Sequence, residues 1–160
     1  MKQTQFDKHT IAWFKIAECV SRGEKERALG VYRLLSHSFN DMAVARQLEG
    51  DIYLSFGEQE LAIPLYKQAM ELYQKSERFL ESVAVCEHLV AMHSDDVTLR
   101  REAIELYKIL GNAPKMYVHI QKSLDIILAT KQEHSVQEFL SVLRAYSDEL
   151  YDFAVAYIKK

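Results

Sequence analysis

The chain contains few of the residues that make turns. Its 160 residues include only two prolines and five glycines. A β-sheet fold with many tight turns depends on both residue types, so the composition favours an all-helical chain. Apolar residues make up 49% and charged residues 27% of the chain, which is typical of a globular protein rather than a disordered one.

Long apolar runs and long basic runs are also missing. No window of 18 residues is free of charge, so we expect no membrane-spanning helix. The first residues lack the continuous apolar core of a secretory signal. The formal charge is −3 and basic residues do not cluster, which argues against a nucleic-acid partner. We therefore expect a cytoplasmic protein that binds neither membranes nor nucleic acid.

Cysteines and catalytic motifs are scarce. Cys19 and Cys86 lie 67 positions apart, each within a helical apolar pattern, and are expected to be buried and reduced. The metal-binding motifs HExxH, CxxC and DxDxDG do not occur. The glycines occur singly, so no phosphate-binding loop is expected. The sequence predicts no metal site, no cofactor and no enzymatic activity.

Small and aromatic residues recur at helical spacing in the middle of the chain. Ala62, Tyr66 and Ala69 are spaced by four and three positions, which places them on one face of a helix. Gly50 and Tyr53 lie one turn apart before them, with a glycine break between the two groups. This pattern predicts a helical hairpin with small residues where the two backbones approach.

The same landmarks repeat along the chain. Ala28 precedes Ala62 by 34 positions, Ser82 follows Ala62 by only 20, and Met116 follows Ser82 by 34 again. The spacing predicts repeats of 34 residues with one extra helix of about 20 residues placed between two of them.

This hairpin resembles the tetratricopeptide repeat (TPR), whose unit is about 34 residues long. The matching positions of the central repeat are Gly50, Tyr53, Ala62, Tyr66 and Ala69, whereas Arg46 and Gln74 stand where the family often has Trp and Pro. In the first helix, Trp13 and Ala17 are matched to the family's Trp and small residue. The resemblance implies an all-α, antiparallel helical-hairpin solenoid, a right-handed superhelix of about eight helices.

We expect one solenoid domain over residues 1–160, because no linker divides the chain. The predicted segments are repeats at about 9–42 and 43–76, an extra helix at 77–96, a repeat at 97–130 and C-terminal capping helices at 131–160.

In TPR arrays a concave groove is lined by first-helix residues that point away from the core of their own hairpin. Transferring the family's positions gives a partner-binding groove of Phe14, Glu18, Gln47, Asp51, Leu54, Arg100, Ile104 and Tyr107. Family members that clamp the C-terminal carboxylate of heat-shock chaperones use Asn, Lys and Arg on this face. Phe14, Glu18 and Leu48 stand there instead, so no carboxylate clamp is expected.

A solenoid offers a long surface with little chemistry of its own, so recognition is the expected function. We predict a protein–protein interaction scaffold, an adaptor or chaperone-like protein that holds a peptide segment of its partner in the groove. Three alternatives stay open. The chain forms a homo-oligomer through its C-terminal helices; it is a subunit of a larger complex, similar to vesicle-fusion adaptors or bacterial secretion chaperones; or it is an enzyme whose site is assembled from distant residues.

Overall fold

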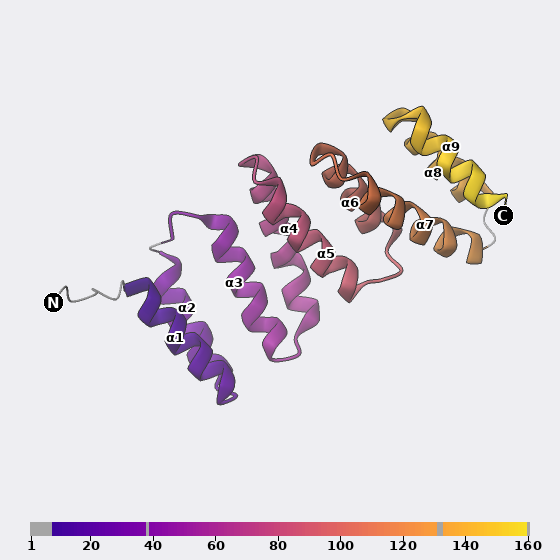
Figure 1. Cartoon of the computed structure of the whole chain (residues 1–160). Coiled ribbons are helices and arrows are strands. Elements are labelled where there is room, and N and C mark those ends of the chain that lie inside the picture. The colour runs from indigo at the N-terminus through magenta and orange to yellow at the C-terminus, as the bar shows by residue number, and fades with distance from the viewer. Residues whose placement is uncertain (1–7, 38, 131–132, 160) are drawn as a thin grey trace. The chain divides into compact units, whose positions relative to one another are not determined.

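All the regular secondary structure of the described chain is helical. The computed structural model describes residues 8–37, 39–130 and 133–159 (Figure 1). The helices are α1 (Lys8–Ser21), α2 (Lys25–Ser36), α3 (Met42–Ser55), α4 (Gln59–Lys75), α5 (Phe79–Met92), α6 (Val97–Ile109), α7 (Ala113–Ala129), α8 (Glu133–Tyr146) and α9 (Asp148–Ile158). The all-α fold is confirmed, with nine helices in these ranges where about eight were predicted.

The chain divides into two compact units, residues 1–78 and 79–160. Unit 1 holds α1 to α4 and unit 2 holds α5 to α9, and within each unit successive helices pack as antiparallel hairpins (Figure 1). The boundary falls at the start of α5, which is the predicted extra helix. One continuous array over residues 1–160, with capping helices from 131 (residues 131 and 132 lie outside the described ranges), stays a prediction.

The first three helices of unit 1 share one hydrophobic core. Its buried members are Ile16 and Cys19 of α1, Ala28, Leu29, Tyr32 and Leu35 of α2, and Leu48 and Ile52 of α3. In the next hairpin Ala62 and Ala69 of α4 are fully buried. A Cβ built on Gly50 would lie 3.1 Å from Cε1 of Tyr66, so α3 and α4 approach closely where the pattern predicted.

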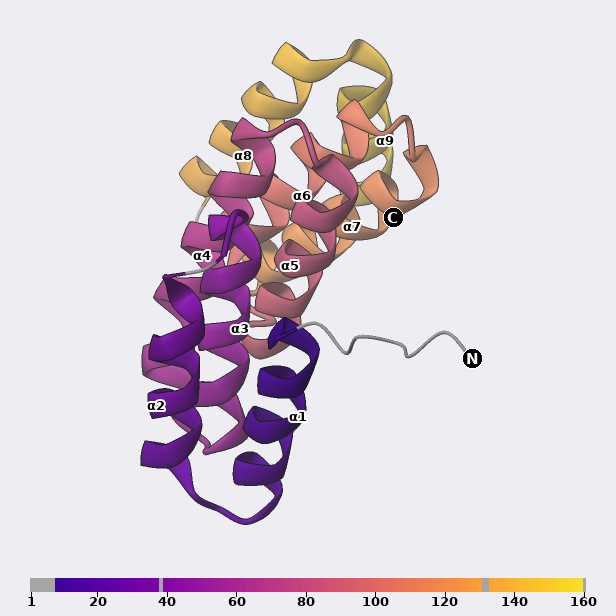
Figure 2. The same cartoon turned by 90° about the vertical axis from the view of Figure 1, so that its left-hand side faces the viewer.

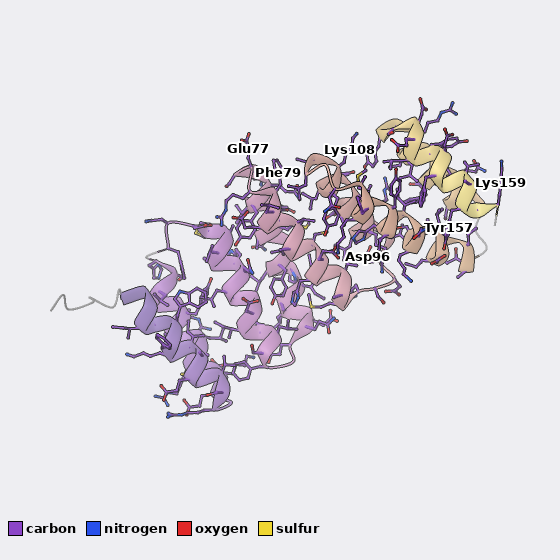
Figure 3. The ribbon with its side chains drawn as sticks, in the orientation of Figure 1. Glu77, Phe79, Asp96, Lys108, Tyr157 and Lys159 are labelled. Atoms are coloured by element: carbon purple, nitrogen blue, oxygen red, sulfur yellow. The ribbon has the colours of Figure 1, made fainter. Side chains whose placement is uncertain are left out.

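Left-handed backbone marks the predicted spacing. Gly23, Gly57, Glu77 and Gly111 adopt φ angles of 73°, 75°, 57° and 66°. They follow one another at intervals of 34, 20 and 34 positions, the same series as the side-chain landmarks. Three of them are glycine, which adopts this conformation without strain. The fourth, Glu77, lies in the turn between the end of α4 at Lys75 and the start of α5 at Phe79 (Figure 3).

The predicted register of α1 was wrong by one position. Trp13 and Ala17 are exposed, whereas Ile16 and Cys19 are buried in the core of unit 1. A shift of one residue turns a helix face by about 100°, which moves a residue from the core to the surface. The core of α1 contains aliphatic and thiol side chains, and the tryptophan lies outside it.

In unit 2, α9 is held to α7 by tyrosine hydrogen bonds. The Tyr117 hydroxyl donates to Glu149 Oε1 at 2.9 Å, and the Tyr157 hydroxyl donates to Asp125 Oδ1 at 2.8 Å. The Tyr117 ring also packs on Phe153 with ring centroids 4.4 Å apart. Helix α9 is therefore an integral part of unit 2. Among the described residues, no helix has the length and apolar character needed to cross a membrane.

Candidate functional site

Three of the predicted groove residues are buried in unit 2. Ile104 is fully buried, and Arg100 and Tyr107 are nearly so. The guanidinium of Arg100 donates through Nε and Nη2 to the carbonyl oxygen of Ser94, at 3.1 and 2.6 Å, and so fastens the segment before α6. These three side chains stabilise the fold of unit 2, which corrects the predicted groove.

The correction is a slip of one residue in α6. Gly57 and Gly111 end equivalent turns 54 positions apart, so α6 residues correspond to α3 residues 54 positions earlier. By this register Gln47, Asp51 and Leu54 correspond to Arg101, Glu105 and Lys108, and not to the buried residues. Glu105 and Lys108 are exposed and Arg101 is half-buried.

On α3 the predicted residues do lie at the surface. Asp51 is exposed, and Gln47 and Leu54 are half-buried. The Tyr66 hydroxyl donates to Asp51 Oδ1 at 2.6 Å, and the Tyr73 hydroxyl donates to Gln47 Oε1 at 2.9 Å. Burial, and then the bond to Asp51, raise the pKa of Tyr66 above its ordinary value of 10. Each tyrosine of α4 thus holds one polar side chain of α3 in place.

On α1 the residues in the same register are Trp13 and Ala17, which lie 34 positions before Gln47 and Asp51. Trp13 is 41% exposed. Helices α1 and α3 lie side by side in unit 1 in both views (Figures 1 and 2). The surface residues that share this register form what we call the first-helix strip: Trp13, Ala17, Gln47, Asp51 and Leu54.

Phe14 and Glu18 belong to a different face of α1. Their counterparts 34 positions later are Leu48 and Ile52, which are buried. Phe14 itself is 67% exposed, and Glu18 forms an ion pair with Arg22 at 2.6 Å. The predicted groove therefore divides into the first-helix strip, an outer face of α1 and three buried residues of unit 2.

A polar cluster in unit 2, in which a half-buried carboxylate meets two buried rings, was missed by sequence reasoning. Glu87 Oε1 accepts from the Tyr107 hydroxyl at 2.6 Å, and His119 Nε2 lies 3.2 Å from the same oxygen. The rings of Tyr107 and His119 stack with centroids 5.7 Å apart. Burial opposes ionisation of Glu87, but these hydrogen bonds outweigh it and hold the pKa of Glu87 below its usual value. The cluster joins α5, α6 and α7, and nearly complete burial of His119 keeps its ring from external substrates.

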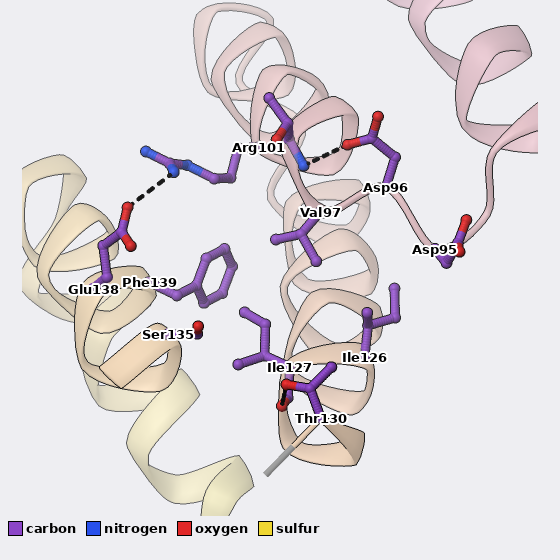
Figure 4. Close-up of a pocket in the computed structure, with 11 residues that line it drawn as sticks. Asp95, Asp96, Val97, Arg101, Ile126, Ile127, Thr130, Ser135, Glu138 and Phe139 are labelled. Atoms are coloured by element: carbon purple, nitrogen blue, oxygen red, sulfur yellow. Dashed lines mark hydrogen bonds and ion pairs between the residues drawn. The ribbon is translucent and has the colours of Figure 1, made fainter. Parts of the chain in front are cut away.

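A cavity of about 480 Å³ opens in unit 2 between α6, α7 and α8 (Figure 4). Three of its polar side chains, those of Asp96, Arg101 and Glu138, are engaged in structural contacts. Asp96 caps α6 by accepting from the backbone N–H groups of Thr98 and Leu99, and Arg101 lies 3.8 Å from Glu138 across the opening (Figure 4). The apolar part of the wall includes Val97, Ile126, Ile127 and Phe139.

The metal-ligating and thiol side chains of the described ranges are few and dispersed. No group of three His, Cys, Asp or Glu side chains in them could hold a metal ion. Cys19 and Cys86 are both free and buried. Burial raises the pKa of Cys86 to about 12, which disfavours its thiolate form.

The fold defines an all-α protein built from antiparallel helical hairpins. No family model matches the chain, and no protein of curated function matches it either. Solved structures that resemble it over most of their length include the following two. One, titled "Crystal structure of MamA", is 16% identical with a TM-score of 0.42 and covers 90% of each chain. The other, "MamA RS-1 ArsTM double mutant", is 16% identical with a TM-score of 0.38 and covers 96% of this chain and 92% of its own.

Proposed function

We propose that the chain is a TPR-type interaction scaffold that binds a peptide segment of a partner protein along the first-helix strip. The observation that carries this proposal is the position of Trp13. It is the chain's single tryptophan, and it lies on the surface of α1 instead of in the core. Tryptophan is enriched among the residues that dominate the energy of protein interfaces.

The polar residues of the strip suit a peptide backbone. Asp51 offers an exposed carboxylate that accepts a backbone N–H of the ligand. The Tyr73 hydroxyl donates to the side-chain oxygen Oε1 of Gln47, so the side-chain NH₂ group of Gln47 is left to donate to a backbone carbonyl of the ligand. Because Tyr66 and Tyr73 already fix these side chains, little rotamer entropy is lost when a ligand binds.

Unit 2 has a corresponding surface of different chemistry. Arg101 and Lys108 are charged where the first-helix strip has Gln47 and Leu54, whereas Glu105 corresponds to the carboxylate of Asp51. Lys108 donates to the carbonyl oxygen of Tyr146 at 3.1 Å, and the Tyr146 hydroxyl donates to Glu105. Contacts of a partner with this surface would be ion pairs at exposed positions, which contribute little affinity. We therefore propose that the contacts that make binding specific lie on the first-helix strip of unit 1.

More specifically, we propose that the scaffold acts as an adaptor or chaperone-like protein in the cytoplasm. Assembly of a homo-oligomer through α9 is less favoured, because Tyr157 and Glu149 of α9 already form hydrogen bonds within unit 2.

The test is selection of peptides from a random displayed library on the full-length protein, followed by affinity measurement. A Gln47→Glu, Asp51→Asn double variant keeps an acceptor for each tyrosine but removes the amide donor and the carboxylate charge. We expect selected peptides to bind this variant at least about tenfold more weakly, and to lose affinity with Trp13→Ala. Leu34→Glu is the matched control, because Leu34 is 82% exposed on α2, away from the strip. Failure to select any saturable ligand, or equal binding by the double variant, would refute the proposal.

A further inference from the structure

The outer face of α1 begins with two apolar side chains that are uncovered among the described residues. Ile11 and Phe14 lie one turn apart on this face and are 46% and 67% exposed. If a fully exposed aromatic side chain has about 200 Å² of surface, the exposed fraction of Phe14 corresponds to roughly 130 Å². Glu18 continues the face toward the end of the helix.

The internal repeat shows what kind of surface this is. Helices α1 and α3 begin 34 positions apart and end 34 positions apart, so each position of α1 has a counterpart in α3. The counterparts of Ile11, Phe14 and Glu18 are Ala45, Leu48 and Ile52, and all three are buried.

The α3 counterparts are covered by the preceding hairpin. Leu48 and Ile52 belong to the core that also contains Leu29 and Leu35 of α2. The Tyr32 hydroxyl of α2 donates to the carbonyl oxygen of Ala45 at 3.1 Å. This face of α3 is therefore a stacking surface for the helix that precedes it, and α1 presents the corresponding surface one repeat earlier, with Glu18 in the place of Ile52.

We propose that the outer face of α1 binds an amphipathic α-helix of a partner protein. The interface continues the α2–α3 contact by one repeat, so the fitting occupant resembles α2. Its apolar side chains recur at i, i+3 and i+6, as Leu29, Tyr32 and Leu35 do in α2. A second copy of the chain does not offer its own α2 for this purpose, because that stripe is already buried in its own core.

This inference rests on the proposed scaffold function, but it uses a different face. Phe14 and Trp13 are adjacent in sequence and point about 100° apart on the helix. Variants of the outer face and variants of the first-helix strip therefore report on separate binding events.

The probe for the test is a fluorescein-labelled peptide of residues 24–37, the sequence of α2 with its flanking residues. Helical structure is enforced by Gly30→Lys and a lactam from Glu26 to the introduced lysine. Glu26 is exposed, and an added Cβ at Gly30 meets nothing within 4 Å, so the bridge stays off the apolar stripe. Fluorescence anisotropy then measures binding to the full-length protein.

We expect saturable binding that Phe14→Glu weakens at least about tenfold. Glu18→Ile recreates the isoleucine of α3 and should tighten binding several-fold. Leu34→Glu, an exposed apolar residue of the same unit, should leave it unchanged.

Absence of saturable binding up to about 1 mM peptide, or equal binding by wild type and Phe14→Glu, would overturn the inference. A dimer in light scattering that Phe14→Glu dissociates would also overturn it, because the occupant would then be a second copy. Peptides selected on the first-helix strip depend on Gln47 and Asp51, so their binding survives if only the outer-face inference fails.

Discussion

Replacing Gly50 by leucine should unfold unit 1 at markedly lower denaturant concentration. A Cβ at this position alone would lie 3.1, 3.2 and 3.3 Å from Cε1, Cζ and Cδ1 of Tyr66. The Tyr66 ring is 1% exposed and its hydroxyl is bound to Asp51 at 2.6 Å, so the ring has no free direction in which to move.

The magnitude combines three terms. Overpacking a filled contact costs about 1–3 kcal/mol. Displacing the Tyr66 hydroxyl from a carboxylate costs about 1.5–3 kcal/mol more. The better helix propensity of leucine returns about 0.8 kcal/mol. The net expectation is a loss of roughly 2–5 kcal/mol from the free energy of unfolding of unit 1.

The assay is urea unfolding of the full-length protein followed by tryptophan fluorescence. Trp13 is the single tryptophan and lies in unit 1, so its emission reports on that unit, whereas far-UV circular dichroism reports on both. With a slope of about 1–3 kcal/mol per M, the urea midpoint should fall by about 1 M or more. The matched control is Gly30→Leu, because Gly30 has a helical backbone and an added Cβ meets nothing within 4 Å. An unchanged midpoint in Gly50→Leu, or equal losses in the two variants, would refute the α3–α4 contact.

Three further predictions concern backbone strain and tyrosine hydrogen bonds. Glu77→Gly should raise the free energy of unfolding of unit 1 by about 0.5–1 kcal/mol, because φ is 57° there; a lower urea midpoint would contradict this. Burial, and then Glu49, raise the pKa of Tyr32 to about 12 from 10, so the folded state holds this proton more tightly than the unfolded chain does. The stability that Tyr32 contributes is therefore complete below pH 10 and is lost between pH 10 and 12. In unfolding measured as a function of pH, Tyr32→Phe should lose less free energy of unfolding over this range than wild type does. An equal loss would count against the hydrogen bond between Tyr32 and Glu49. Tyr107→Phe should lower the free energy of unfolding of unit 2 by about 1.5–3 kcal/mol, because it removes a hydrogen-bond donor from Glu87. The loss should appear in circular dichroism, while the unfolding transition followed by tryptophan fluorescence stays in place. A shift of both transitions would contradict the assignment of this contact to unit 2.

The helical class could be read from the sequence because it depends on local patterns. Helix-forming periodicity, scarce proline and glycines at helix ends act within a few residues of one another. The series of 34, 20 and 34 positions predicted from Ala28, Ala62, Ser82 and Met116 reappears in the positive φ angles of the backbone. It includes Glu77, whose side chain gave no signal that a glycine-like conformation was needed.

The candidate site was predicted less well, because it depends on helix rotation. A one-residue slip in α6 selected Ile104 and Tyr107, which are buried, in place of Glu105 and Lys108, which are exposed. An apolar residue on an amphipathic helix fits a core or a binding surface equally well by composition. Counting 54 positions from Gln47 and Asp51 would have found the correct register.

The amino-acid sequence by itself determined that this chain forms helices, where most of them end, and at what interval small residues meet. Each of these properties follows from interactions between residues close in the chain. Tertiary structure alone decided that Trp13 faces outward, that tyrosine hydroxyls fix Gln47 and Asp51, and that Glu87 joins three helices. Those outcomes depend on the rotation of each helix against its neighbours, which is set by the packing of side chains from distant segments.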